Sequence, residues 1–184
     1  TNIVLKEMGL SGIETKYAWQ INERHYGALQ GLNKAEMAQK YGEGQVYIWR
    51  RSWAVRPPEM DEVQYAAQNE QKIFKDVPHG MMPKTESLAD TYARAMRYWD
   101  SDIVPAIKAG KNILVSAHGN SLRAIVKFLD QVSDDDISTL NLPTGVPLVY
   151  ELDENLKPLK HYFLGDPAAI EARINKVKNQ GKPK

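Results

Sequence analysis

Residues 116–121, Ser-Ala-His-Gly-Asn-Ser, place a histidine directly after a short apolar run at 113–115. The run is short and β-branched, which predicts a buried parallel strand, and the apolar spacing that follows predicts a helix. Side chains just past the carboxyl end of such a strand point into the ligand crevice of an open α/β sheet. The N–H groups that begin the helix attract an anion, above all a phosphate. His118 is therefore either a phosphate-binding residue or a buried histidine that satisfies a backbone carbonyl.

A second group of titratable residues occupies 22–27, which read Asn-Glu-Arg-His-Tyr-Gly. Apolar residues alternate with polar ones over 17–21, and this alternation predicts a short strand that leads into the group. A carboxylate in such a loop, here Glu23, acts as a general acid or base, or forms one half of an ion pair. The spacing alone favours the ion pair.

Arg50 and Arg51 are adjacent on a predicted helix. Their planar guanidinium groups suit bidentate recognition of phosphate or carboxylate. Neighbouring side chains on a helix diverge by about 100°, so both reach one ligand only if it spans that angle. The alternative is two solvated arginines. Together with Lys34 and His118, they indicate a site for a small polyanion, and no metal-binding pattern of His and acidic residues occurs.

The composition favours one globular domain over 1–184. The chain has 184 residues, 42% of them hydrophobic, and a net charge of +1, which argues against a dedicated nucleic-acid surface. It has no cysteine, so disulfides, thiolate nucleophiles and Cys-ligated metals are excluded, in keeping with a reducing cytosol. No apolar run approaches the length needed to span a membrane.

The predicted elements alternate between strand and helix. Asn33 begins one helix and Gly42 ends it, and Ser87 opens the strongest helical pattern. The polar stretch 56–84, with one short helix near Tyr65, is expected to be a covering insertion. The remaining elements are a short helix capped at 133–136, an antiparallel hairpin of 148–152 with 160–164, a helix over 168–177 and a flexible basic tail at 178–184.

This order predicts an α/β fold, a three-layer α/β/α sandwich whose sheet is mostly parallel with a late antiparallel hairpin. Only about four strands are visible, few for such a sheet. Residues 1–10 read as the end of a helix, and there is no initiator Met. We therefore expect the chain to lack its N-terminal portion, including the first strand or strands.

Four longer stretches, 22–34, 49–52, 117–123 and 142–150, resemble the cofactor-dependent phosphoglycerate mutases of the histidine phosphatase superfamily. The resemblance runs from end to end and keeps the order of the motifs. It implies the interconversion of 3-phosphoglycerate and 2-phosphoglycerate in glycolysis and gluconeogenesis, through a phosphohistidine primed by 2,3-bisphosphoglycerate. It also implies a cytoplasmic homodimer or homotetramer with no metal, nucleic-acid partner or membrane.

The same resemblance assigns roles by position. Glu23 matches the general acid/base, and His118 matches the second active-site histidine, which stabilises the transferring phosphoryl group. The substrate-binding positions that it implies are Arg24, His25, Tyr26, Lys34, Arg50, Arg51, Gly119 and Asn120.

The chain departs from the family at the nucleophile, which is the histidine of an Arg-His-Gly motif. Arg24-His25 is followed by Tyr26, and His79-Gly80 and His118-Gly119 lack the preceding arginine. Without that histidine there is no phosphohistidine, so this chain alone is expected to be inactive. The alternatives are a phosphatase of the same superfamily and a non-catalytic fragment that binds phosphorylated ligands.

Overall fold

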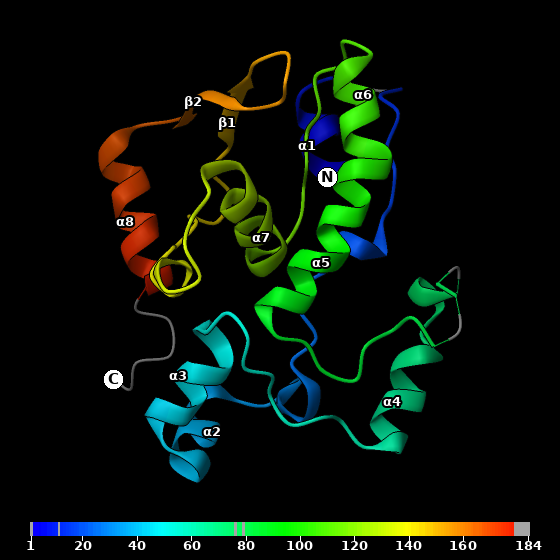
Figure 1. Cartoon of the computed structure of the whole chain (residues 1–184), viewed down its shortest axis with the longest axis vertical. Helices are drawn as coiled ribbons and strands as arrows, with labels where there is room; N and C mark the ends of the chain where they lie inside the picture. The colour runs from blue at the N-terminus through cyan, green and yellow to red at the C-terminus, as the bar shows by residue number, and fades with distance from the viewer. Residues whose placement is uncertain (1, 11, 76, 79, 179–184) are drawn as a thin grey trace.

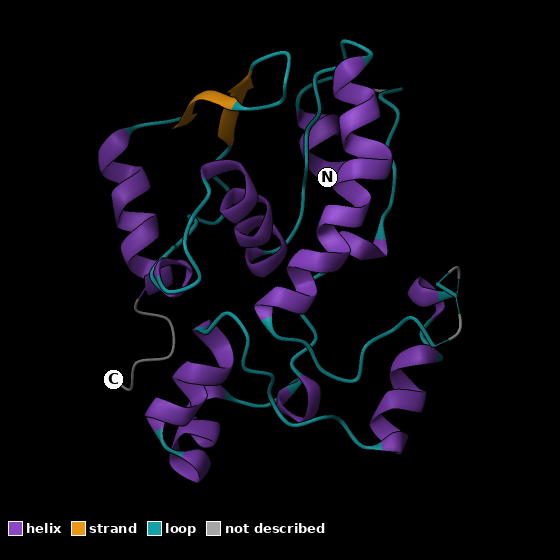
Figure 2. Ribbon diagram, in the orientation of Figure 1, coloured by secondary structure: helices purple, strands orange, loops and turns teal. Residues whose placement is uncertain are grey.

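The computed structural model describes residues 2–10, 12–75, 77–78 and 80–178. Helices make up most of the regular structure, and the sheet of the described residues is one antiparallel hairpin (Figure 2). The helices and strands are α1 (Asn2–Glu7), α2 (Lys34–Tyr41), α3 (Glu43–Arg51), α4 (Glu62–Asn69), α5 (Leu88–Tyr98), α6 (Val104–Lys108), α7 (Gly119–Asp130), α8 (Pro167–Lys178), β1 (Leu148–Leu152) and β2 (Pro158–Phe163). Single 3-10 turns occupy Trp19–Ile21, Gly27–Leu29, Lys72–Phe74 and Asp136–Ser138.

The helix over α5 continues through one π-helical turn at Trp99–Ile103 into α6, which has Pro105 in its first turn. This long helix packs against α7 in the upper part of the molecule (Figure 1). The cluster between them holds Trp99, Ile103, Ile125 and Leu129, each at most 7% exposed. Burial of these large apolar side chains is the main favourable term for this half of the fold.

Two helix starts confirm their predicted caps. The Asn33 side chain accepts a hydrogen bond from the Ala35 amide at 2.8 Å, and α2 begins at the next residue. Ser87 and Asp90 form a reciprocal capping box at the start of α5. Gly42, with φ of +82°, ends α2 as expected, because glycine adopts positive φ at little cost.

A smaller cluster lies between α2 and α3, at the lower left of Figure 1. Leu29, Met37 and Val46 form its buried centre, and Tyr26 and Trp49 pack on its edge. The predicted helix that carries Arg50 and Arg51 is confirmed as α3, although it ends at Arg51, well before the Pro57-Pro58 pair. The stretch 56–84 extends away from this unit and carries α4, which includes Tyr65 as predicted.

The predicted hairpin is confirmed, with Tyr150 paired to His161 in the antiparallel register. Asp130, the last residue of α7, receives a hydrogen bond from the Tyr150 hydroxyl at 2.9 Å and lies 3.1 Å from His161 Nδ1. The hairpin is therefore anchored to the end of α7. Helix α8 follows it and confirms the last predicted helix, while the tail beyond 178 lies outside the described residues.

Two predicted strands are not formed in the described structure. Residues 111–117 run as an extended loop, and Ile113 and Leu114 are 40% and 67% exposed rather than buried. Residues Trp19–Ile21 form a 3-10 turn, and Tyr17 before it is 84% exposed. A strand needs a neighbour to pair with, and the described residues offer none at either place. The fold is α/β with one small sheet, and the predicted parallel sheet is not present in the described part of the chain.

Over the described residues, no helix is both long and apolar enough to cross a lipid bilayer.

Candidate active site

Glu23 lies in an irregular loop between the 3-10 turns at Trp19–Ile21 and Gly27–Leu29. Its Oε1 accepts a hydrogen bond from the Arg24 amide at 2.7 Å. Its Oε2 points toward the start of α7, since a Cβ built on Gly119 would lie 3.9 Å from that oxygen. The carboxylate is half-buried. The loop therefore presents one acidic group to the N-terminus of a twelve-residue helix.

His118 is the N-cap residue of α7 and is exposed. The Ser121 hydroxyl accepts a hydrogen bond from the His118 amide at 3.3 Å and donates one to the His118 carbonyl at 3.1 Å. These contacts fix the backbone at the helix start, where N–H groups and the positive end of the helix dipole face outward. Because the predicted strand before it is a loop, His118 is not the buried residue of the alternative interpretation.

Arg24 is 1% exposed and ties the Glu23 loop to the end of α3. Its Nη2 donates to the Trp49 carbonyl at 2.8 Å and to the Arg50 carbonyl at 3.0 Å. A cation suits these terminal carbonyls of a helix. Its Nε and Nη1 have no partner among the described residues. Burial is the main cause that lowers the pKa of this guanidinium from its ordinary value.

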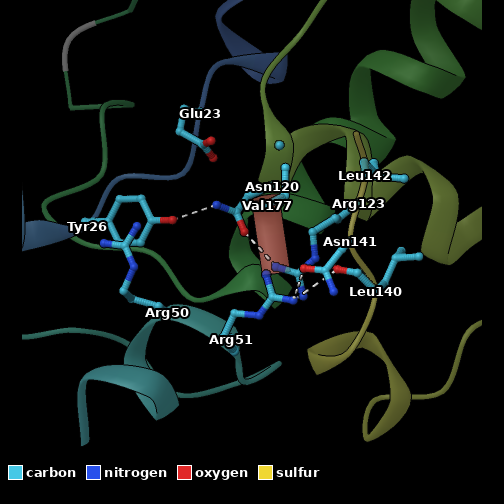
Figure 3. A pocket seen from close by; sticks show the side chains of 11 residues that line it. Glu23, Tyr26, Arg50, Arg51, Asn120, Arg123, Leu140, Asn141, Leu142 and Val177 are labelled. Atoms are coloured by element: carbon cyan, nitrogen blue, oxygen red, sulfur yellow. Dashed lines mark hydrogen bonds between the residues drawn. The ribbon is translucent and has the colours of Figure 1, made fainter. Parts of the chain in front are cut away.

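Tyr26 connects three of the predicted residues. The guanidinium carbons of Arg24 and Arg50 lie 4.5 and 4.7 Å from its ring centroid. Its hydroxyl accepts a hydrogen bond from Asn120 Nδ2 at 2.7 Å (Figure 3). This bond spans 94 residues of sequence. It joins the loop before α2 to the first turn of α7.

Arg51 diverges from Arg50, as the helical geometry predicts, and reaches the segment after α7. Its Nε donates to the Ser138 carbonyl at 2.9 Å, and its Nη2 donates to the Leu140 carbonyl and to Asn141 Oδ1 at 3.2 and 2.9 Å. These bonds use part of its donor set and hold the guanidinium in one orientation.

Arg123 is a site residue to which sequence reasoning gave no role. Its Nη1 donates to Asn120 Oδ1 at 2.9 Å, and its Nη2 donates to the Ile137 carbonyl. It is 4% exposed, and its Nε has no partner among the described residues. Burial, followed by the charges of Arg51 and Arg24, lowers its pKa to about 10. The sequence did contain a signal for this role, because Arg123 follows Asn120 by three residues and so lies on the same face of the helix.

These side chains border two clefts that share Glu23. The first cleft is shown in Figure 3, with the Glu23 carboxylate on one side and Arg51 and Arg123 on the other. Its lining residues are Glu23, Tyr26, Arg50, Arg51, Gly119, Asn120, Arg123, Leu140, Asn141, Leu142 and Val177. The second cleft combines Glu23, Arg24, His25 and His118 with residues from 60–74.

Most of the predicted site residues are thus brought together. Six of them line the first cleft: Glu23, Tyr26, Arg50, Arg51, Gly119 and Asn120. Arg24, His25 and His118 lie on the second cleft, where His25 Nδ1 is 3.1 Å from Gln68 Oε1. Burial lowers the pKa of His25, which favours the neutral imidazole. Lys34 is the first residue of α2, and its side chain lies outside the part of the structure that is described.

The first cleft has the chemistry of an anion site. Three guanidinium groups line it beside one carboxylate, and the start of α7 adds backbone N–H donors. Arg123, which lines this cleft, has a buried Nε without a partner among the described residues, and such a donor carries a cost until an acceptor meets it. A ligand with several phosphate or carboxylate oxygens supplies such acceptors. Glu23, placed beside them, can exchange a proton with the same ligand.

Comparison with known proteins agrees with this chemistry. Residues 2–163 match the histidine phosphatase superfamily (branch 1). The chain is 51% identical over 183 residues to the 2,3-bisphosphoglycerate-dependent phosphoglycerate mutase of Borrelia garinii subsp. bavariensis, covering 100% of this chain and 74% of that protein. It is 52% identical over 181 residues to the protein of the same name from Borreliella afzelii, covering 98% of this chain and 73% of that protein. The chain belongs to the histidine phosphatase superfamily, in the family of the 2,3-bisphosphoglycerate-dependent phosphoglycerate mutases.

Proposed function

We propose that this protein interconverts 3-phosphoglycerate and 2-phosphoglycerate by phosphoryl transfer through a phosphohistidine, primed by 2,3-bisphosphoglycerate. The observation that carries the proposal is the position of Glu23, half-buried and facing Gly119 at the start of α7, beside the guanidinium groups of the first cleft. A phosphoryl-transfer site needs an anion cradle and one group that moves a proton. The names of the relatives support the same activity.

Glu23 takes the role of general acid/base in this proposal. Its carboxylate accepts the proton of the substrate hydroxyl as that oxygen bonds to phosphorus and the P–N bond of the phosphohistidine breaks. In the reverse step it gives a proton to the ester oxygen as the P–O bond breaks and the histidine takes up the phosphoryl group. The resemblance assigns that histidine to an Arg-His-Gly motif that this sequence does not contain. The hydrogen bond from the Arg24 amide orients one carboxylate oxygen and leaves Oε2 directed toward Gly119. His118 donates a hydrogen bond to the oxygens of the transferring group, where charge develops in the transition state.

The arginines hold the anionic ends of the substrate. Arg50 and Arg51 diverge on α3, so together they suit a ligand with anionic groups at separate positions, such as a phosphate and a carboxylate. Gly119 and Asn120 contribute the start of α7, with Tyr26 behind Asn120. Lys34 joins this set by position in the family motif. Arg123 Nε and the Nε and Nη1 of Arg24 have no partner within the part of the chain that the structure describes. This supports a bisphosphorylated primer, which supplies two further acceptor groups.

We further infer the setting of the site. The stretch 56–84 acts as a cover, since its residues 60–74 form one wall of the second cleft. The predicted strand at 113–115, which carries exposed Ile113 and Leu114 and has no neighbouring strand among the described residues, joins a parallel sheet of a three-layer sandwich when such a neighbour is present. The protein is a cytoplasmic homodimer or homotetramer. These inferences follow the family, and exposed apolar side chains on extended backbone support the second of them.

A mutase assay on the protein made from the intact gene tests the activity. The expected result is formation of 2-phosphoglycerate from 3-phosphoglycerate that depends on trace 2,3-bisphosphoglycerate. Release of inorganic phosphate as the main product would identify a phosphatase instead.

A titration of this 184-residue chain with 2,3-bisphosphoglycerate tests the binding role separately. The expected result is salt-dependent binding, because the cleft recognises the ligand by charge. Binding without any turnover by the intact gene product would leave only a phospholigand-binding protein, and no binding would contradict the assignment of the cleft.

A further inference from the structure

Arg94, in the middle of α5, makes an unusual number of contacts for one side chain. It is 6% exposed. Its Nη1 donates to the Gln20 carbonyl at 2.6 Å and to the Trp19 carbonyl at 3.4 Å, and its Nη2 donates to the Asn22 and Glu23 carbonyls at 3.0 and 3.1 Å. All four acceptors belong to the backbone just before and at Glu23. The guanidinium therefore binds the loop from inside the molecule.

Glu86, just before α5, completes the arrangement. Its Oε1 accepts from Arg94 Nε at 2.6 Å and its Oε2 from Arg94 Nη2 at 2.9 Å, a bidentate ion pair in which both side chains are less than 10% exposed. Oε2 also accepts from the His25 amide at 3.0 Å, and the Glu86 amide donates to the His25 carbonyl at 2.8 Å. The pair thus holds the backbone on both sides of Glu23 and Arg24.

This loop has no sheet ladder to fix it in the described residues. The carbonyls of Asn22 and Glu23 bond to Arg94, and the His25 backbone bonds to Glu86. We propose that Arg94, paired with Glu86, is a positioning residue for the Glu23 carboxylate, acting through the Glu23 backbone and touching no substrate. The proposal rests on the proposed function only for the consequence that a displaced Glu23 slows the reaction.

The chemistry of arginine explains why this position requires it. A planar guanidinium offers five donors in a fixed fork and serves a carboxylate on one edge and carbonyls on the other. A lysine keeps the charge that Glu86 needs but offers three donors at one point, so it cannot reach both sets of acceptors. Arg94→Lys therefore removes the loop contacts while the buried carboxylate remains paired.

The test compares Arg94→Lys with a control, Arg97→Lys, in the protein made from the intact gene. Arg97 is exposed, lies on α5 like Arg94, and lines neither cleft. For Arg94→Lys we expect kcat to fall about 100-fold, since small displacements of a reacting group have such effects. KM should change less than about threefold, because the arginines of the first cleft are untouched. The control should behave as wild type in both constants.

Amide hydrogen exchange gives the readout that does not depend on turnover. In Arg94→Lys, exchange should become faster in the peptide that covers 19–26 and stay unchanged in the peptide that covers α3. Wild-type kcat, or unchanged exchange in 19–26, would overturn the proposal. Faster exchange in both peptides with a parallel rise in KM would also overturn it, since that pattern indicates general destabilisation. If the unmodified protein shows no mutase turnover, the proposed function fails and the exchange comparison alone decides whether Arg94 holds the loop.

Discussion

At the scale of single residues, the carboxylate of Glu23 is held in one orientation without a cationic partner among the described residues. Its spacing among Arg24, His25 and Tyr26 favoured an ion pair, yet no salt bridge to Glu23 occurs among the described residues. One oxygen is held by a backbone amide and the other points toward Gly119. A carboxylate that is oriented but not neutralised by a cation suits proton exchange with a ligand.

We expect Glu23→Gln to lower kcat by about 10²- to 10⁴-fold, the usual contribution of a general acid/base. The amide has the same shape, and its oxygen can still accept from the Arg24 amide, so binding of 2,3-bisphosphoglycerate should change little. Steady-state kinetics and calorimetric titration measure the two effects. The matched control is Glu59→Gln, an exposed carboxylate that lines neither cleft. Unchanged turnover in Glu23→Gln would remove this residue from proton transfer.

Arg50 and Arg51 are neighbours in sequence but differ in what they do for the fold. The Arg50 guanidinium packs on the Tyr26 ring and, within the described part of the chain, makes no hydrogen bond. Arg51 donates to the Ser138 and Leu140 carbonyls and to the Asn141 side chain. The first is free to bind a ligand, while the second both lines the cleft and joins α3 to the segment after α7.

Replacing each by Met should separate these roles. Both variants should bind 2,3-bisphosphoglycerate about tenfold or more weakly, since a charge-assisted hydrogen bond contributes about 1.5–3 kcal/mol. Arg50→Met should lower the free energy of unfolding by less than about 1 kcal/mol, the scale of one exposed cation–π contact. Arg51→Met should lower the free energy of unfolding by about 1–3 kcal/mol, because three partly buried acceptors lose their donor. Equal stability of the two variants in urea unfolding would contradict this division.

At the scale of elements, capping residues in the sequence correctly predicted where two helices begin. Asn33 and Ser87 act as caps where expected, because an N-cap depends on residues within one turn. The run at 113–115 did not behave as expected, because a strand requires a partner that local sequence does not specify. The alternation at 17–21 failed for the same reason.

The start of α5 combines a cap with an ion pair. Hydrogen bonds from Arg56 and, with a smaller effect, Ser87 lower the pKa of Asp90 to about 2. Because the folded-state pKa lies below the ordinary value of 3.8, this contribution to stability is present above about pH 4 and is lost as the pH falls toward 2.

Asp90→Asn should therefore be less stable than wild type at pH 7, by about 1 kcal/mol once solvent screening of the exposed Arg56 is allowed for. Urea unfolding at a series of pH values should show the difference shrinking between pH 4 and 2. Asp100→Asn, an exposed carboxylate on the same long helix, is the control. A difference that stays constant down to pH 2 would show that the charge of Asp90 is not what stabilises the helix start.

At the scale of the whole molecule, the first cleft is lined by helices that belong to two separate hydrophobic clusters. One cluster is centred on α5 and α7, the other on α2 and α3. Polar bonds join them: Tyr26 to Asn120, Arg51 to the Leu140 region, and Arg94 to the Glu23 loop. The family motifs predicted nine residues that line one of the two clefts: Glu23, Arg24, His25, Tyr26, Arg50, Arg51, His118, Gly119 and Asn120. The roles of Arg94 and Arg123 escaped prediction, because each depends on backbone carbonyls that local sequence does not mark as partners.

Protonation of His25 makes the free energy of unfolding of the whole protein depend on pH. His25 is 7% exposed, and burial is the main cause that lowers its pKa below the ordinary value of 6.5. The charges that face it are Glu86 and Glu23, which raise the pKa, and Arg94, which lowers it. The unfolded state binds the proton more readily than the folded state does. The stability that the neutral imidazole contributes is therefore present above about pH 6.5 and is lost as the pH falls through the lower folded-state value.

We expect the free energy of unfolding of the wild type to fall between pH 7 and pH 5 more steeply than that of His25→Gln. The slopes should differ by up to about 1.4 kcal/mol per pH unit, the effect of one proton taken up on unfolding. Glutamine does not titrate, and its amide can still meet Gln68. His25→Asn serves as the matched control, because a shorter side chain changes the stability at pH 8 but removes the same proton. Both variants should show the same flattened slope in urea unfolding. A slope equal to that of the wild type in both would mean that His25 takes up no extra proton on unfolding in this range.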